Sequence, residues 1–368
     1  KYMESLLMRK LNNYFRSKRP ISSKDNACEV FQEGDLIEIG FISKQCKNDL
    51  AGTCLMCDYG HSKGTFENQI YINKMKEILS SKSEGMNFLL LCSNGSILDE
   101  YQISKELFID ILKIAQNCSI PNIIIETYYK DINVETLTII KKYISKPVII
   151  EMGLETANQE YQDLVLMKGI NIATYEKTIE LIHSFNFKIE LNIMIGLPFF
   201  SLKEMFGDAI KTINWAIEKG CDPVLFPINI KPYTTLYYLY ENELYESISL
   251  WLIVLILDEL NINKLDKVII AWYGNRDDSY KKNKPNIFPT SCNKCKTKLS
   301  LFFRNFLNSI NCEDRKFLIK KLLEELDCNC LKKLKDNLDK EQNYFKENLQ
   351  KFYDFILKKS NETLKGDN

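Results

Sequence analysis

The sequence predicts an α/β protein, a partial (β/α)6 TIM-like barrel followed by a helical C-terminal extension. Six short apolar runs have the length of strands and are nearly unbroken, as is typical of parallel strands covered on both faces. Helical stretches with apolar residues at i, i+3 and i+4 separate these runs, and this alternation implies right-handed crossovers. With 368 residues and 45% hydrophobic content, the chain can build a barrel-sized core and a smaller part beside it.

The expected elements follow one another in a regular order. The six runs expected as strands are 35–43, 87–92, 122–126, 148–151, 189–195 and 223–230. The helices expected between them include 105–117, 133–144, 174–185 and 202–219. We therefore expect three regions: an N-terminal helical extension over 1–34, the barrel over 35–258, and a cysteine-containing, mainly helical extension over 259–368.

Composition favours a cytoplasmic enzyme. Basic and acidic residues both total 49, so the net charge is zero and gives no overall attraction to nucleic acid. The basic stretches 9–19 and 281–284 could touch phosphates, although such runs are more often solvated faces. Only two histidines occur, which disfavours a hydrolase built on imidazole chemistry. The apolar run 250–257 is far shorter than the roughly 18 residues of a membrane helix, and no apolar signal segment opens the chain, so we expect no membrane partner.

Three cysteines in one loop after the first expected strand are the most informative feature. Cys46, Cys54 and Cys57 form a C-x7-C-x2-C pattern. A [4Fe–4S] cluster needs four ligands, so three thiolates leave one iron open for a small molecule. Two other readings remain open at this point: half of a structural zinc site, or thiols that bind no metal.

The loop resembles the cluster loop of the radical S-adenosylmethionine (SAM) superfamily, whose members bind the amine and carboxylate of SAM at the open iron. The usual spacing of that superfamily is C-x3-C-x2-C, and the longer first spacing here occurs in the branch of the elongator-type tRNA enzymes and the archaeosine-type radical enzymes. The segment from Cys54 to Tyr59, Cys-Leu-Met-Cys-Asp-Tyr, is most similar to the archaeosine type. The resemblance places Tyr59 among the cofactor-binding residues.

In such barrels the chemistry sits at the C-terminal ends of the strands. Ser93-Asn94-Gly95-Ser96 follows the second run and resembles the glycine-containing motif that grips the methionyl amine; a tight turn is the alternative. Glu126 ends the third run, where related enzymes place an acidic residue on the cofactor. A structural ion pair is the alternative there, because a buried carboxylate needs a partner.

The fourth and fifth strand ends complete the expected cofactor site. By the resemblance, Glu151, Gly153, Glu155 and Thr156 lie near the ribose of SAM. Near the adenine we expect Asn192, Met194, Gly196, Leu197 and Pro198. A Gly-Leu-Pro sequence is also a natural break between a strand and a loop, which is the structural alternative.

Five further cysteines lie in the C-terminal extension. Cys292 and Cys295 form a C-x2-C pair in a segment expected to be a loop, so they could ligate a second metal, either zinc or an iron–sulfur cluster. Cys312, Cys328 and Cys330 could join them or stay unlinked. The spacing of Cys328-x-Cys330 is too short for the usual zinc knuckle, so we expect these two to be bystanders on a charged helix.

The resemblance implies a radical SAM enzyme. A [4Fe–4S] cluster on Cys46, Cys54 and Cys57 would reductively cleave SAM to a 5′-deoxyadenosyl radical, which abstracts hydrogen from a substrate. The archaeosine-type family implies a modified deazaguanine or tRNA nucleoside as substrate, and a flavodoxin or ferredoxin as reducing partner. The alternatives are radical SAM modification of a peptide or small-molecule natural product, and a non-catalytic zinc-binding barrel protein.

Overall fold

The computed structural model describes residues 2–20, 26–58, 65–271, 285–325 and 328–366. One curved sheet dominates it, with the strands in sequence order from β1 to β8. The strands are Cys28–Glu33 (β1), Leu36–Phe41 (β2), Phe88–Ser93 (β3), Asn122–Thr127 (β4), Val148–Glu155 (β5), Lys188–Ile195 (β6), Asp222–Pro227 (β7) and Ile269–Ile270 (β8). Every neighbouring pair from β2 to β8 is parallel, which confirms the predicted partial barrel.

The six predicted strands correspond to β2 through β7. Two strands were not predicted, and both lie outside the span expected for the barrel. β1 pairs antiparallel with β2 at the sheet edge, and its polar, half-buried residues lack an apolar run. β8 has only two residues, too few to produce a sequence signal.

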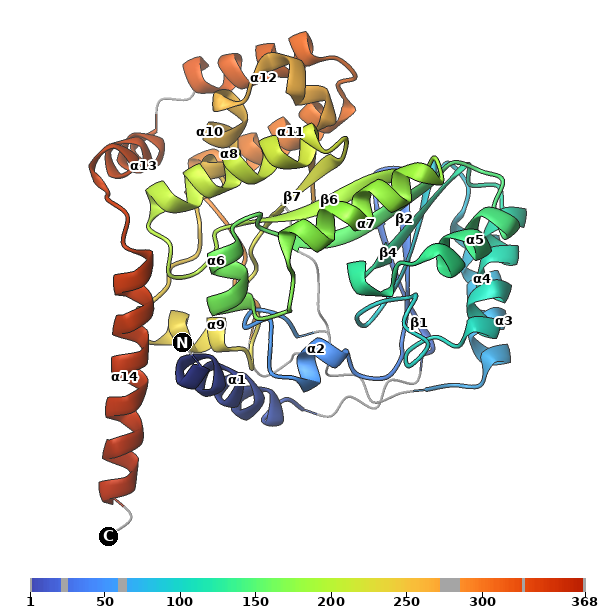
Figure 1. Cartoon of the computed structure of the whole chain (residues 1–368). Helices are drawn as coiled ribbons and strands as arrows, with labels where there is room; N and C mark the ends of the chain where they lie inside the picture. Colours follow the sequence, from blue (N-terminus) through green and yellow to red (C-terminus); the bar gives the residue numbers. More distant parts are fainter. Residues whose placement is uncertain (1, 21–25, 59–64, 272–284, 326–327, 367–368) are drawn as a thin grey trace.

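Helices cover the outer face of the sheet (Figure 1). The crossover helices are Asn68–Lys82 (α3), Lys105–Asn117 (α4), Val134–Tyr143 (α5), Ile172–Ser184 (α7) and Leu202–Glu218 (α8). Each of the four predicted helices is present. α4 shows why: Ser104 caps its start by accepting a hydrogen bond from the Leu107 amide, and its apolar stripe is buried against the sheet.

The C-terminal extension is helical, as predicted. It follows Trp251–Glu259 (α10) and consists of Asn293–Asn308 (α11), Cys312–Glu325 (α12), Asn329–Lys340 (α13) and Phe345–Gly366 (α14). All residues from Trp251 to Leu257 are buried, so the apolar run 250–257 forms a core helix. Within the described part of the chain, no helix has the length and apolar character needed to cross a membrane.

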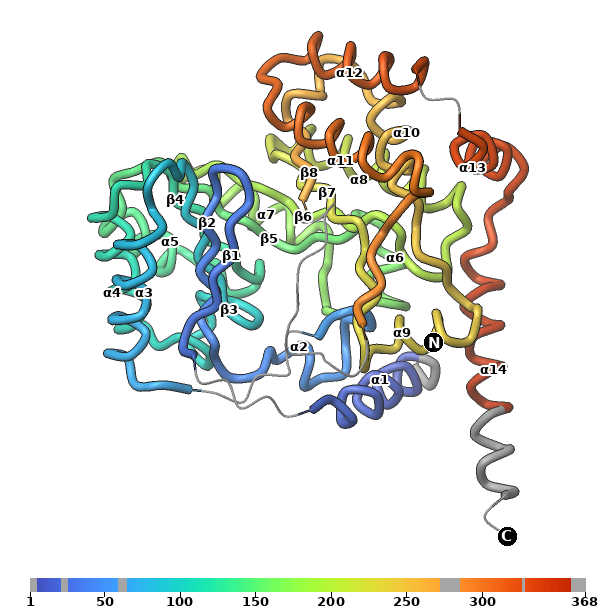
Figure 2. Tube along the Cα trace, turned by 180° about the vertical axis from the view of Figure 1, so that it is seen from behind, coloured from blue at the N-terminus to red at the C-terminus, as the bar shows by residue number. Residues whose placement is uncertain are grey.

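A second hydrophobic core lies at the C-terminal ends of the strands. It joins Tyr2–Ser17 (α1), the cysteine loop, Thr235–Glu241 (α9) and α14. Figures 1 and 2 both show α14 running past α9 and α1, although these elements are far apart in the sequence. Phe15 of α1 stacks on Tyr238 of α9 with ring centroids 4.8 Å apart, and Tyr238 also contacts Phe355 of α14. Both chain ends therefore help to enclose the cysteine loop.

Candidate active site

The three loop cysteines line one cavity, which runs along the inner face of the sheet from Leu36 and Phe88, where β2 and β3 begin, to the loops at the C-terminal ends of the strands. Cys46 stands directly before the short helix Lys47–Leu50 (α2), and Cys54 has a left-handed backbone with φ of 57°. The Cys57 amide donates to the Cys54 carbonyl at 2.9 Å. All three residues line a cavity of about 1490 Å³. Burial raises the pKa of the Cys54 thiol to about 11 and that of the Cys57 thiol to about 12.

Gly95 brings the loop after β3 directly against Cys46. A Cβ atom at Gly95 would lie 2.7 Å from the Cys46 sulfur, so only glycine permits this approach. The side chain of Gln102 fixes the motif, because its Oε1 accepts hydrogen bonds from the amides of Gly95 and Ser96 and from the Ser93 hydroxyl. The amides of Gly95 and Ser96 are thus occupied within the protein.

Most of the predicted cofactor residues line the same cavity. These are Ser93, Asn94, Gly95, Glu126, Glu151, Gly153, Glu155, Asn192 and Met194. They come from the ends of β3 to β6, as the strand-end rule predicts. Three buried side-chain oxygens of lining residues have no hydrogen-bond partner among the described atoms: Glu155 Oε2, Asn192 Oδ1 and Asn229 Oδ1. The cavity therefore presents acceptors to a ligand that carries hydrogen-bond donors.

Five predicted cofactor residues are not among the residues that line the cavity, and their contact with the cofactor stays a prediction. Ser96 bonds the Thr127 hydroxyl at 2.7 Å, and Thr156 donates to Asp208 at 3.0 Å on α8. Burial raises the pKa of Asp208 to about 6. The remaining three residues form the Gly-Leu-Pro turn described next. Tyr59 lies outside the described residues.

The Gly-Leu-Pro turn packs within the protein interior. Gly196 has φ of 97°, and a Cβ there would come within 2.6 Å of Ile248. Leu197 is buried in the second core, and the Pro198 carbonyl accepts a hydrogen bond from Tyr161 at 3.0 Å. The left-handed glycine and the buried leucine agree with the structural alternative, and contact of these three residues with the adenine stays a prediction.

Two buried ion pairs flank the cavity, and sequence reasoning missed their roles. Lys168 lies 2.7 Å from Glu155, and Lys231 lies 2.9 Å from Asp58, the residue after Cys57. Burial alone would lower the pKa of Lys168, but Glu155 holds it above its ordinary value. Since both lysines line the cavity, they place positive charge beside the thiols. The sequence signal for Lys231 was its position, together with Asn229, at the end of an apolar run expected as a strand.

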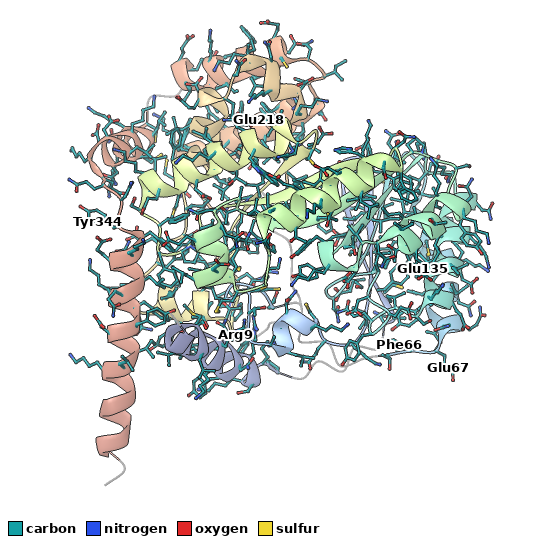
Figure 3. The ribbon with its side chains drawn as sticks, in the orientation of Figure 1. Arg9, Phe66, Glu67, Glu135, Glu218 and Tyr344 are labelled. Carbon is teal, nitrogen blue, oxygen red and sulfur yellow. The ribbon has the colours of Figure 1, made fainter. Side chains whose placement is uncertain are left out.

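Basic residues in α1 and directly after it hold the cysteine loop from outside. Arg16 donates to the carbonyls of Thr53 and Cys54 and pairs with Asp49 at 2.9 Å, while Arg19 reaches the same Asp49 at 2.7 Å. Arg16 is 7% exposed. Arg9, labelled in Figure 3 on the side of α1 that faces the loop, donates to the Ala51 carbonyl. The expectation that 9–19 is a solvated or phosphate-binding face is therefore wrong for these arginines.

The C-terminal cysteines form a second group, remote from the first in sequence. The sulfur atoms of Cys292, Cys295, Cys328 and Cys330 all lie within 4.8 Å of one another. The expectation that Cys328 and Cys330 are bystanders is wrong. Cys328 has an extended backbone and Cys330 lies in the first turn of α13, so the turn into the helix brings both sulfurs together at 3.1 Å despite the short spacing.

Comparisons with known proteins agree with the predicted resemblance. No family model matches the chain. An uncharacterized protein of Methanocaldococcus jannaschii is 26% identical over 307 residues, covering 78% of this chain and 83% of that protein. The archaeosine synthase subunit beta of Thermococcus kodakarensis is 28% identical over 166 residues, or 44% of this chain and about half of that subunit (51%). This match confirms the resemblance to the archaeosine-type branch.

A solved structure of the queuine lyase from Clostridium spiroforme, bound to SAM and queuine, is also similar. Its TM-score is 0.41 and its identity is 18%. The match covers 67% of this chain and 94% of that one.

Proposed function

We propose that this chain is a radical SAM enzyme in which Cys46, Cys54 and Cys57 hold a [4Fe–4S] cluster beside a SAM-binding cavity. The observation that carries the proposal is the opening of all three thiols onto the cavity at the strand ends, with Cys46 packed on Gly95. In this position SAM bound to the cluster and a substrate in the barrel would lie side by side.

The number of cysteines in the loop favours a cluster over a closed zinc site. A structural zinc ion takes four ligands, and the loop supplies three cysteines. A [4Fe–4S] cluster held by three thiolates keeps one iron open for SAM.

The protein's own contribution is to hold and orient the three loop thiols. Arg16 donates to the successive carbonyls of Thr53 and Cys54. Lys231 pairs with Asp58, the residue next to Cys57. These contacts hold the loop without the help of a metal. The chemistry that the cluster supplies when bound is the one-electron cleavage of SAM into methionine and a 5′-deoxyadenosyl radical, with the electron coming from a flavodoxin or ferredoxin.

The lining of the cavity suits the charge and the donors of SAM. The unpartnered oxygens of Glu155, Asn192 and Asn229 can accept hydrogen bonds from the ammonium group, the ribose hydroxyls and the adenine amine. The carboxylates of Glu126 and Glu151 face the same space. A cavity rich in carboxylates favours a ligand that carries a sulfonium and an ammonium charge.

For the substrate we propose a modified deazaguanine nucleoside, free or in tRNA. The similarity to archaeosine synthase subunit beta supports this class.

Anaerobic reconstitution tests the proposal. The chain should bind about four irons at the loop and, with a reductant, convert SAM to 5′-deoxyadenosine. Cys54→Ala should lose iron and cleavage, while Cys118→Ser, remote from the cavity, should keep both. Adding tRNA that carries a modified deazaguanine should accelerate cleavage and alter the base. Iron retained in Cys54→Ala would contradict the cluster, and a peptide that accelerates cleavage when tRNA does not would contradict the substrate class.

A further inference from the structure

We propose that Cys292, Cys295, Cys328 and Cys330 bind one structural Zn²⁺ ion that fastens α13 and α14 to the barrel. The Sγ–Sγ separations are 3.1 Å for Cys328–Cys330, 3.4 Å for Cys292–Cys328, 3.6 Å for Cys295–Cys330 and 3.7 Å for Cys292–Cys330. A tetrahedron of sulfurs around zinc has edges of about 3.8 Å, so these values fit a single ion. They are far longer than a disulfide bond of about 2.05 Å.

A [4Fe–4S] cluster does not fit this group. Its eight atoms have to lie between the four ligating sulfurs, and sulfurs within 4.8 Å of one another leave no room for them. Four thiolates in a compact tetrahedron with no open position are the ligand set of structural zinc.

Two helix starts converge to build the site. Cys292 directly precedes α11 and Cys295 lies in its first turn, while Cys328 directly precedes α13 and Cys330 lies in its first turn. The first amides of a helix have no partner within the helix, and the positive end of the helix dipole favours negative charge. Both helices thus direct donors and positive potential toward thiolates, which metal binding requires.

A buried donor gives an independent indication. Trp251, the first residue of α10, is fully buried, and its indole N–H has no hydrogen-bond partner among the described residues. This N–H lies close enough to the Cys295 thiol to lower its pKa as a hydrogen-bond donor does, although the contact lacks the geometry of a regular hydrogen bond. A metal-bound thiolate at Cys295 is the acceptor that this N–H lacks, and donors of this kind commonly orient metal ligands.

The zinc would anchor the start of a segment that closes over the barrel. At the far end of α13, the Glu341 carboxylate accepts a hydrogen bond from the Leu202 amide at the start of α8. In return, Glu204 of α8 accepts hydrogen bonds from the amides of Tyr344 and Phe345, where α14 begins. Figure 3 labels Tyr344 at this junction. Zinc at one end and reciprocal capping at the other would therefore hold α13 in place.

Metal analysis of the full chain tests the zinc assignment independently of the proposed activity. The wild-type protein should carry one zinc in addition to the iron of the N-terminal loop. Cys330→Ser and Cys292→Ser should each lose the zinc and keep the iron. Cys292 is exposed, so its replacement leaves the core intact, and Cys292→His should retain zinc because three cysteines and one histidine also bind it. The control Cys312→Ser should keep both metals.

Two results would overturn the assignment. One is an unchanged zinc content in Cys330→Ser. The other is iron in place of zinc at this site, seen as iron that remains when Cys46, Cys54 and Cys57 are all replaced by alanine. For the fastening role, limited proteolysis should cut zinc-free Cys292→Ser near α13 many-fold faster than Cys292→His. Equal rates of cleavage would overturn that role.

Discussion

Replacing Gly95 by alanine should disturb Cys46 while leaving the barrel folded. The added Cβ would lie 2.7 Å from the Cys46 sulfur, 3.0 Å from the Cys46 Cβ and 2.8 Å from Gln102 Nε2. Non-bonded atoms of this kind normally stand about 3.5–4.0 Å apart, so Cys46 has to retreat by roughly 1 Å. Overpacking of this size costs about 1–3 kcal/mol, enough to reduce ligation by Cys46 by about one to two powers of ten.

Iron content, measured after anaerobic reconstitution, and 5′-deoxyadenosine formation report this change. Gly95→Ala should lose iron and cleavage while its far-ultraviolet circular dichroism stays that of the wild type. Gly207→Ala is the matched control, because a Cβ at Gly207 meets nothing within 4 Å and alanine favours the helix there. If Gly95→Ala binds iron and cleaves SAM at the wild-type level, the packing of Cys46 on this glycine is not part of the site.

Three further changes probe the surroundings. Arg16→Ala leaves two loop carbonyls without their donor and Asp49 with Arg19 as its remaining partner, so urea unfolding should show a loss of about 1–3 kcal/mol. Lys10→Ala, exposed on the same helix, should change the free energy of unfolding by about 0.5 kcal/mol or less. Equal losses in the two variants would show that Arg16 does not stabilise the loop. Burial raises the pKa of Asp208 to about 6, so the folded chain holds this proton more tightly than the unfolded chain. The free energy of unfolding should therefore fall by at most about 3 kcal/mol from pH 4 to 6; if Asp208→Asn keeps this slope, another group is responsible. Asn192→Ala should weaken SAM binding in calorimetry by about 0.5–1.5 kcal/mol with iron unchanged; unaltered affinity would place the ligand elsewhere.

Local patterns predicted the barrel and much of the candidate site. Strands β2 to β7 are nearly continuous apolar runs, and the strand-end rule placed residues such as Glu126 and Asn192 on the cavity. The Gly-Leu-Pro turn does not line the cavity, because the left-handed backbone at Gly196 directs the chain into the interior. That conformation depends on contacts with Ile248 and Tyr245, which no local pattern encodes.

Long-range partners explain the other differences. Arg16 bonds the Cys54 carbonyl across 38 residues, and a basic helix with such partners has the same sequence pattern as a solvated one. Cys292 and Cys328 are 36 residues apart and meet because α13 packs against α10 and α8, which brings its first residues to the start of α11. The prediction compared the spacing of Cys328 and Cys330 with that of a zinc knuckle. In the structure the two cysteines lie at the start of α13, where the turn into the helix brings their sulfurs together.

The cysteine loop is shaped by contacts that do not involve its thiols. Asn12 and Arg16 of α1, and Arg19 directly after it, bind the loop carbonyls and Asp49. Gly52 lies against the backbone of α1, where a Cβ would come within 2.6 Å of the Arg9 carbonyl oxygen. Burial keeps the thiols of Cys54 and Cys57 protonated at neutral pH, so iron has to displace their protons. The path of the loop is therefore fixed before a metal binds. Replacing a cysteine should remove the iron and keep the conformation of the loop, whereas replacing Arg16 should disturb the conformation of the loop and thereby remove the iron as well.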